Sequence, residues 1–346
     1  GINLGLGELL SHGIDYENIW STETTDGIPK IQIQDTNWQV GAYVLRTGND
    51  IGGNWYLAPW GSDTLGDGSF NNPYFTLNKL WTVISAGDTA YLRGGTYEYT
   101  SAQILTGNSG TVDNYINVFN YPNEIPNITK SSTFTYPGWP ATLIRVGGSY
   151  LYFKGLEISY AEQSPTNNLG GFAGYYLHNS IIERFNVHHC GGGCQLLYAG
   201  DNHVINSDFH HNYDPYDVAR PYPDPGYDPY GDADGLSIQD DGYGTETIVR
   251  GCRFWCNSDD GIDLWYSRKK VTIENCWSFW NGYSDNGVTP YDDPLTTGYD
   301  GDGNGFKLGP LVPSPGTGYE TEHLRTVNNC IAAFNSYHGF TQNSAD

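Results

Sequence analysis

A short order of polar and apolar positions recurs in the second half of the chain. It reads ADGLSI at 233–238, DDGIDL at 259–264 and GNGFKL at 303–308, and a fourth copy, HGFTQN, begins at His338. The first three phrases place Asp-Gly or Asn-Gly before an apolar residue, a polar residue and then Ile or Leu. Such a repeat predicts a β solenoid whose coils place equivalent positions about 4.8 Å apart.

Further coils can be followed from about Tyr150, at a spacing of roughly 22 to 26 residues once insertions are excluded. Asparagines recur in one register at the coil ends: Asn212, Asn257, Asn281 and Asn335. Asparagines stacked at a turn can hydrogen-bond to the next coil and to one another. We therefore expect an asparagine ladder along the solenoid.

Three of the six cysteines share a position in this repeat. Cys252, Cys276 and Cys330 each lie five residues before an asparagine, which favours an inward-facing column of small side chains over disulfides. Bridges that involve Cys190, Cys194 or Cys256 stay open. Cys190 and Cys194 have no second cysteine pair at the spacing that zinc fingers use, so we do not expect a metal site there.

The N-terminal end of the repeat carries a helical pattern. Leu77, Leu80, Trp81 and Ile84 follow the period of an amphipathic helix, and an alternating strand pattern follows at 86–97. A helix in this position predicts a cap over the open end of the solenoid, whose edge strands would otherwise be free to pair with other chains.

The remaining segments suggest how the chain is organised. Residues 1–52 lack the repeat and are interpreted as an N-terminal attachment or lead-in segment, through which the protein could form an oligomer or a larger assembly. Residues 53–346 form the predicted β-helix domain, which we expect to be truncated because Asp346 falls inside a coil. Two Tyr-, Pro- and Asp-rich stretches, 213–232 and 283–302, are predicted loops that wall a cleft beside the coils.

The charge of the chain restricts its partners. It has 16 Lys and Arg against 39 Asp and Glu, a formal net charge of −23. A chain this acidic is a poor binder of nucleic acid, and no segment approaches the roughly 20 apolar residues that span a bilayer. We expect a secreted or surface-displayed protein, or alternatively a virion appendage. Tyr and Trp are abundant, and they either stack on sugar rings or pack the β core.

The recurring phrases bring acidic side chains together. In the predicted register Asp234 lies under Asp260, and Ser237, Asp263 and Lys307 form a column. Four carboxylates, including Asp259, then converge within two coils and repel one another strongly. A hard cation that prefers oxygen ligands, such as Ca²⁺, would neutralise them. Asp-Gly pairs also make simple turns, but that reading leaves Asp263, inside a strand, unexplained.

Two neighbouring features are less specific. The segment DGDGNG at 300–305 begins like an EF-hand loop, but Leu311 stands where the bidentate Glu is required, so we interpret it as a turn-rich loop. The basic run Arg268, Lys269 and Lys270 could bind an anionic substrate or form a solvated turn. By position alone, Lys307 is equally compatible with a structural ion pair to Asp263 and with a catalytic base.

These phrases resemble polysaccharide lyase family 9, the calcium-dependent lyases of pectic polysaccharides with a right-handed parallel β-helix. The resemblance covers most of residues 54–346, and its most specific motifs are NSDDGIDL and GNGFKLG. It implies that Ca²⁺ is bound by four residues and that Lys307 is the Brønsted base. The implied ligands are Asp234, Asp259, Asp260 and Asp263.

The implied reaction is β-elimination on a uronate-containing pectic polymer. Calcium would bind the C6 carboxylate and stabilise the charge that forms when Lys307 removes the C5 proton. The bond from C4 to the glycosidic oxygen then breaks and leaves an unsaturated uronate. Two alternatives stay open: a β-helix module of a phage tail spike or surface fibre that binds glycan with or without cleaving it, and a purely structural solenoid.

Overall fold

We describe a computed structural model of the chain. It describes residues 54–219, 230–240, 242–265, 267–283, 301–309 and 324–342. The predicted N-terminal segment 1–52 lies outside these residues, as do large parts of the two predicted loops, so those predictions remain open.

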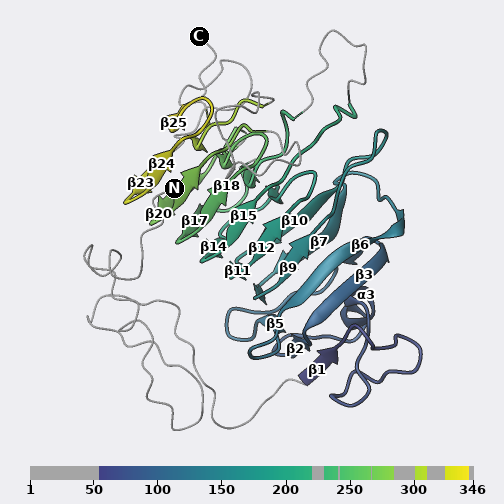
Figure 1. The fold of residues 1–346 in the computed structure, drawn as a ribbon. Helices are drawn as coiled ribbons and strands as arrows, with labels where there is room; N and C mark the ends of the chain where they lie inside the picture. The colour runs from purple at the N-terminus through teal and green to yellow at the C-terminus, as the bar shows by residue number, and fades with distance from the viewer. Residues whose placement is uncertain are drawn as a thin grey trace. The chain divides into compact units, whose positions relative to one another are not determined.

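The described chain winds into coils, and each full coil adds one strand to each of three sheets (Figure 1). The first sheet has nine strands, in the order β1 (Asn54–Leu57), β2 (Thr89–Leu92), β5 (Ile116–Asn120), β8 (Leu151–Lys154), β11 (Ile181–Glu183), β14 (His203–Ile205), β17 (Glu246–Arg250), β20 (Lys270–Glu274) and β23 (Arg325–Asn328). The second sheet has eight, in the order β4 (Gln103–Leu105), β7 (Thr142–Ser149), β10 (Gly170–His178), β13 (Cys194–Leu197), β16 (Leu236–Gln239), β19 (Ile262–Asp263), β22 (Phe306–Lys307) and β25 (Phe340–Thr341). The third sheet also has eight, in the order β3 (Gly95–Ser101), β6 (Pro126–Thr135), β9 (Glu157–Ser159), β12 (Asn186–His188), β15 (Asp208–His210), β18 (Arg253–Trp255), β21 (Trp277–Phe279) and β24 (Ile331–Ala333).

Neighbouring strands within these sheets pair in parallel, which confirms the predicted solenoid. Val187 pairs with Phe209, and Phe209 with Phe254, so that equivalent residues of successive coils stack. Their side chains point inward and are fully buried. Because successive side chains of a strand alternate between its two faces, one set of side chains packs in the core and the other set points outward.

The asparagine ladder is present as predicted. Asn212 Nδ2 donates to Asn257 Oδ1, Asn257 Nδ2 to Asn281 Oδ1 and Asn281 Nδ2 to Asn335 Oδ1, each at 2.9 Å. Asn212, Asn257 and Asn281 are fully buried, so the side-chain amides satisfy one another where water is excluded.

The cysteine column is also as predicted. The thiols of Cys252, Cys276 and Cys330 are free, and the first two are fully buried. Backbone N–H groups of Cys252 and Cys276 point at the sulfur of the next cysteine in the column at 3.4 Å. The thiols of Cys190 and Cys194 are free as well.

The predicted helix near the N-terminal end is α3, Leu77–Trp81, which is shorter than the apolar period suggested. Thr76 caps it, because the Thr76 hydroxyl accepts a bond from Lys79 N at 3.0 Å. Leu77, Leu80 and Trp81 join the core, and α3 lies beside the first coil in Figure 1. Whether α3 closes the end of the solenoid remains a prediction.

Coils are present well before Tyr150, where their register could first be followed in the sequence, and within the domain predicted from residue 53. β2, β3 and β4 already form a coil between Thr89 and Leu105, and β1 pairs with β2 ahead of it. The strand pattern expected at 86–97 is divided between β2 and β3, because Gly94 and Gly95 lie where the chain passes from the first sheet to the third. Among the described residues, no helix is long and apolar enough to cross a membrane.

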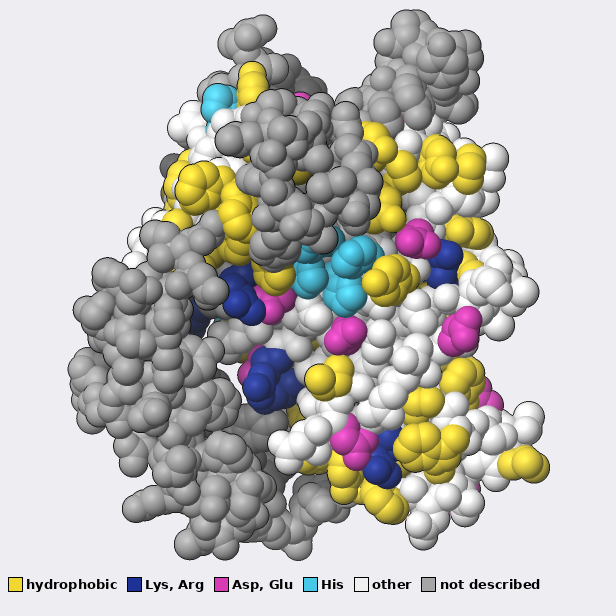
Figure 2. All heavy atoms as spheres, viewed as in Figure 1, with side chains coloured by type: hydrophobic (Ala, Val, Ile, Leu, Met, Phe, Trp, Pro, Cys, Tyr) yellow, Lys and Arg dark blue, Asp and Glu magenta, His cyan; other side chains and the backbone are white. Residues whose placement is uncertain are grey.

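Histidine side chains gather on the face of the molecule drawn in Figure 2. On the third sheet, the ring of His188 stacks on His210 with centroids 5.0 Å apart, and His210 stacks on Trp255 at 4.1 Å. His189 and His211, at the strand ends, stack in the same way at 5.2 Å. Burial and the neighbouring histidines lower the pKa of His210 to about 2, so its ring is neutral in the folded protein.

Candidate active site

The predicted column of polar residues forms on the second sheet. Ser237 on β16 pairs with Asp263 on β19, and Asp263 pairs with Lys307 on β22. The fourth phrase continues the stack, since Lys307 pairs with Thr341 on β25. The register read from the sequence is therefore confirmed.

This column faces away from the core. Ile262 and Leu264 flank Asp263 and are fully buried in the core, as is Phe306 beside Lys307. Because neighbouring residues of a strand point to opposite faces, Asp263 and Lys307 point outward. Their side chains nevertheless retain only 13% and 11% exposure, so the column lies in a recessed part of the outer face.

A second column runs through the turns that precede these strands. Asp234 Oδ1 accepts a bond from Asp260 N at 3.2 Å, and Asp260 Oδ1 accepts one from Asn304 N at 2.8 Å. The glycine after each residue allows the coils to approach. A Cβ on Gly261, for example, would come within 2.6 Å of Gly305 O.

Carboxylate oxygens of Asp234, Asp260 and Asp263 all lie within 4.8 Å of one another, a spacing that suits a shared metal ion. Burial raises the pKa of Asp234 well above its ordinary value, and the carboxylates of Asp263, Asp259 and Asp260 raise it further. Burial likewise raises the pKa of Asp263 to about 6, even though Lys307 opposes the shift. Burial, and for Asp234 also the repulsion of the other carboxylates, disfavours the charged form of these acids, and a bound cation would offset both effects.

Asp259 lies outside this group of three carboxylates. It is buried, and its Oδ1 has no hydrogen-bond partner among the described residues. Burial and then Asp260 raise its pKa well above the ordinary value. An unsatisfied buried carboxylate oxygen beside three other acids is compatible with a fourth oxygen ligand for a hard cation.

Lys307 is the cation that the structure places among these acids. Its Nζ lies 2.9 Å from Asp260 Oδ2 and 3.5 Å from Asp263 Oδ2. Burial alone lowers the pKa of Lys307, but the surrounding carboxylates, Asp263 and Asp260 foremost, outweigh it and raise the pKa above its ordinary value. Lys307 is thus a protonated partner of two acids, as in the ion-pair alternative left open by the sequence. The ring of Trp265 lies 5.9 Å from the same Nζ.

The structure adds Asn304, which the sequence analysis did not select. Its Nδ2 donates to Asp260 Oδ1 at 2.8 Å, and its buried Oδ1 has no hydrogen-bond partner among the described residues. Asn304 belongs to the segment interpreted as a turn-rich loop, of which Asp300 lies outside the described residues. The signal was present, since Asn304 occupies the position of Asp234 and Asp260 in the repeated phrase.

The basic run lies beside the site sheet but is held by other contacts. The backbone N–H groups of Arg268 and Lys269 donate to the buried carboxylate of Asp240 at 2.8 and 2.9 Å. Lys270 belongs to β20 of the first sheet, and its Nζ lies 3.0 Å from Glu246 Oε1. A role for these three residues in substrate binding remains a prediction.

Comparison with known proteins identifies the family. Residues 55–346 match the model of the Pel9A-like, right handed beta helix region. Pectate lyase L of Dickeya dadantii (strain 3937) is 30% identical over 306 residues, which cover 84% of this chain and 61% of that protein. The chain therefore spans about three fifths of the length of this relative.

Two solved structures share the architecture. A rhamnogalacturonan lyase aligns with a TM-score of 0.66 and 28% identity over 82% of this chain and 69% of that chain. The crystal structure of pectate lyase Pel9A aligns with a TM-score of 0.64 and 27% identity over 84% of this chain and 66% of that chain. The predicted fold class is confirmed, and the chain belongs to the Pel9A-like family of right-handed parallel β-helix proteins.

Proposed function

We propose that this chain is a polysaccharide lyase that cleaves a uronate-containing pectic polymer by calcium-assisted β-elimination, with Lys307 as the base. The observation that carries the proposal is the position of the Lys307 ammonium, 2.9 Å from one acid of a three-carboxylate cluster. The names of the relatives, pectate lyase and rhamnogalacturonan lyase, support a pectic substrate.

The donor set suits Ca²⁺. Asp234, Asp260 and Asp263 offer carboxylate oxygens within reach of one ion, and the unsatisfied oxygens of Asp259 and Asn304 lie beside them in the same turns. Ca²⁺ takes six to eight oxygen ligands, and the protein would supply a large part of that number. When bound, the ion supplies positive charge for the uronate carboxylate and for the negative charge that develops at C5.

Lys307 changes partners in this scheme. In the structure, the carboxylates of Asp260 and Asp263 hold its proton. When their carboxylates are committed to a cation, the same ammonium loses its stabilising negative charges and gains a positive neighbour, so its pKa falls. Lys307 is then able to accept the C5 proton, after which the bond from C4 to the glycosidic oxygen breaks and an unsaturated uronate forms.

The test is a lyase assay on polygalacturonate, rhamnogalacturonan and alginate at alkaline pH. The ultraviolet absorbance of the unsaturated product is followed with calcium and with chelator. We expect product from a pectic polymer with calcium alone, and a loss of about 10²- to 10⁴-fold in kcat for Lys307→Ala. Lys154→Ala is the matched control, because Lys154 is another partly buried ion-paired lysine, on the first sheet.

Each outcome separates the open readings. Full activity in Lys307→Ala would refute the proposed base, and full activity in chelator would refute the role of calcium. Retention of the protein on a pectic polymer without product would identify a binding module. The absence of both product and retention would leave a structural solenoid.

A further inference from the structure

The outward column that carries Asp263 continues along the second sheet, well beyond the acidic cluster. Five residues on neighbouring strands follow one another in register along this column: Asp263, Ser237, Gln195, Ala173 and Arg145. Arg145 points outward like Asp263, because Ile144 and Val146 on either side of it belong to the core. One continuous row of side chains thus joins Arg145 to the candidate active site.

The length of this row matches a stretch of polysaccharide. Arg145 lies four strand steps from Asp263, which corresponds to roughly 19 Å. A 1,4-linked pyranose advances a polysaccharide chain by a length comparable to one strand step. In a polysaccharide that lies along the row, the sugar beside Arg145 would be about four sugars away from the acidic cluster.

Arg145 is a cation with unused binding capacity. One guanidinium nitrogen, Nη1, donates to Trp139 O at 3.3 Å, while Nε is buried and has no hydrogen-bond partner among the described residues. No described carboxylate forms an ion pair with it, although the chain carries a net charge of −23. A guanidinium without a carboxylate partner is suited to bind an anionic ligand.

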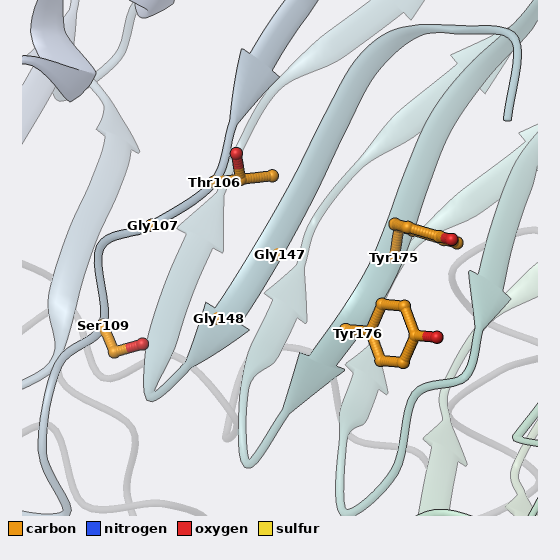
Figure 3. A pocket seen from close by; sticks show the side chains of 7 residues that line it. All are labelled: Thr106, Gly107, Ser109, Gly147, Gly148, Tyr175 and Tyr176. Carbon is orange, nitrogen blue, oxygen red and sulfur yellow. The ribbon is translucent and has the colours of Figure 1, made fainter. Parts of the chain in front are cut away.

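A hollow of about 340 Å³ lies on the same sheet (Figure 3). It is lined by Thr106, Gly107, Ser109, Gly147, Gly148, Tyr175 and Tyr176. Two of its lining residues, Gly147 and Gly148, follow Arg145 along β7. Gly147 allows β7 and β10 to approach closely here, since a Cβ on it would lie 2.5 Å from Tyr175 O. The pairing of β7 with β10 is irregular between Gly174 and Leu177, so both tyrosines occur at a bulge, a device that re-aims side chains.

Aromatic rings border the hollow. The Trp139 ring contacts Tyr175 edge to face with centroids 5.5 Å apart, and Tyr176 stacks on Tyr198 at 5.0 Å. Trp139 is 65% exposed, so its ring is accessible to a ligand. Exposed rings beside hydroxyl groups and a cation are the surroundings that a charged sugar requires.

We propose that Arg145, with the adjoining hollow, forms a subsite that binds a uronate carboxylate of the same polysaccharide, about four sugars from the acidic cluster. This inference rests on the proposed function, because the ligand is the substrate of that site. Arg145 forms a charge-assisted pair with the carboxylate, and Trp139 and Tyr175 contact the sugar ring.

Arg145→Gln removes the charge and keeps a polar side chain. On polygalacturonate we expect KM to rise about 10- to 100-fold, the loss of one charge-assisted hydrogen-bonded pair, with kcat unchanged. On trigalacturonate, which is too short to reach from the acidic cluster to Arg145, KM should stay the same. Arg253→Gln is the control, because Arg253 is an exposed arginine on the third sheet, paired with Asp208.

A second measurement keeps the subsite testable if the proposed reaction is wrong. In the presence of chelator, we compare how strongly gels containing polygalacturonate retard two proteins. One is the variant Lys307→Ala, and the other is the double variant Lys307→Ala with Arg145→Gln. Loss of retardation in the double variant supports the subsite even if no lyase activity is found. Equal retardation of the two proteins, or an equal rise in KM on polymer and trimer, would overturn it.

Discussion

Replacing Lys307 by methionine should destabilise the metal-free protein and at the same time strengthen its binding of calcium. The ammonium and the cation compete for the same carboxylates, because Lys307 Nζ lies 2.9 Å from Asp260 and 3.5 Å from Asp263. Methionine is unbranched and one atom shorter than lysine, and it removes the charge and the N–H donors of the ammonium. The two expected effects have opposite signs, so a general loss of folding cannot produce both.

The structure sets the size of the first effect. At an effective dielectric constant of about 20, charges at these two distances attract by roughly 5 to 6 kcal/mol each before desolvation is counted. Asp260 is fully buried, and removal of one partner of a buried ion pair costs about 3 to 5 kcal/mol. We therefore expect the free energy of unfolding in chelator to fall by about 3 to 5 kcal/mol in Lys307→Met.

Chemical denaturation in chelator and in a calcium titration measures both effects. Calcium stabilises the folded protein by RT ln(1 + [Ca²⁺]/Kd), so the titration gives Kd for each protein. We expect Kd to be at least about tenfold lower in Lys307→Met, which corresponds to 1.4 kcal/mol. Lys154→Met is the control: Lys154 lies 3.2 Å from Glu183 on the first sheet, and its loss should not change Kd.

Two results would refute this reasoning. If Lys307→Met is as stable as the wild type in chelator, the ion pair does not stabilise the fold. If calcium stabilises both proteins with the same Kd, the ammonium and the cation do not share ligands, and the cluster is not the calcium site.

Two further predictions concern the solenoid. Asn257→Ala leaves Asn212 Nδ2 and Asn281 Oδ1 without side-chain partners in the buried ladder, so unfolding in denaturant should show a loss of about 2 to 5 kcal/mol; a smaller loss than for the half-buried Asn335→Ala would contradict the ladder's role. His210 is neutral when folded but takes up a proton near pH 6.5 when unfolded, so its contribution to stability is lost as the pH falls below 6.5, by up to about 2 kcal/mol at pH 5. Between pH 7 and pH 5, the Tm of His210→Gln should therefore fall less than the Tm of the wild type. An equal fall would refute a neutral His210 in the folded protein.

The repeated phrases predicted the site column correctly because a solenoid converts sequence period into spatial neighbours. Once ADGLSI, DDGIDL and GNGFKL are aligned, strand pairing alone places Ser237, Asp263 and Lys307 in register. The same logic predicted the asparagine ladder and the cysteine column. The register is the same on either side of each insertion, because Ser237 pairs with Gln195 and Lys307 pairs with Asp263.

The sequence was less informative where the chain departs from the repeat. The β-helix domain was predicted from residue 53, but the register of its first coils could not be read, because they share no phrase with the later coils. Arg145 escaped notice for a similar reason, since its link to the site passes through Ala173 and Gln195, which carry no signal by themselves. Tyr175 and Tyr176 border the hollow only because the sheet is irregular at that point.

By itself, the sequence determined the coil period, the register of the column and the kinds of side chain in it, because these depend only on residue order and strand alternation. Tertiary structure decided which atoms meet. It placed Lys307 closer to Asp260 than to Asp263, left Asp259 outside the group of three carboxylates and brought Asn304 onto Asp260. These outcomes depend on side-chain rotamers, turn geometry and burial. Together they bring charges that are far apart in the sequence into one site from which water is largely excluded.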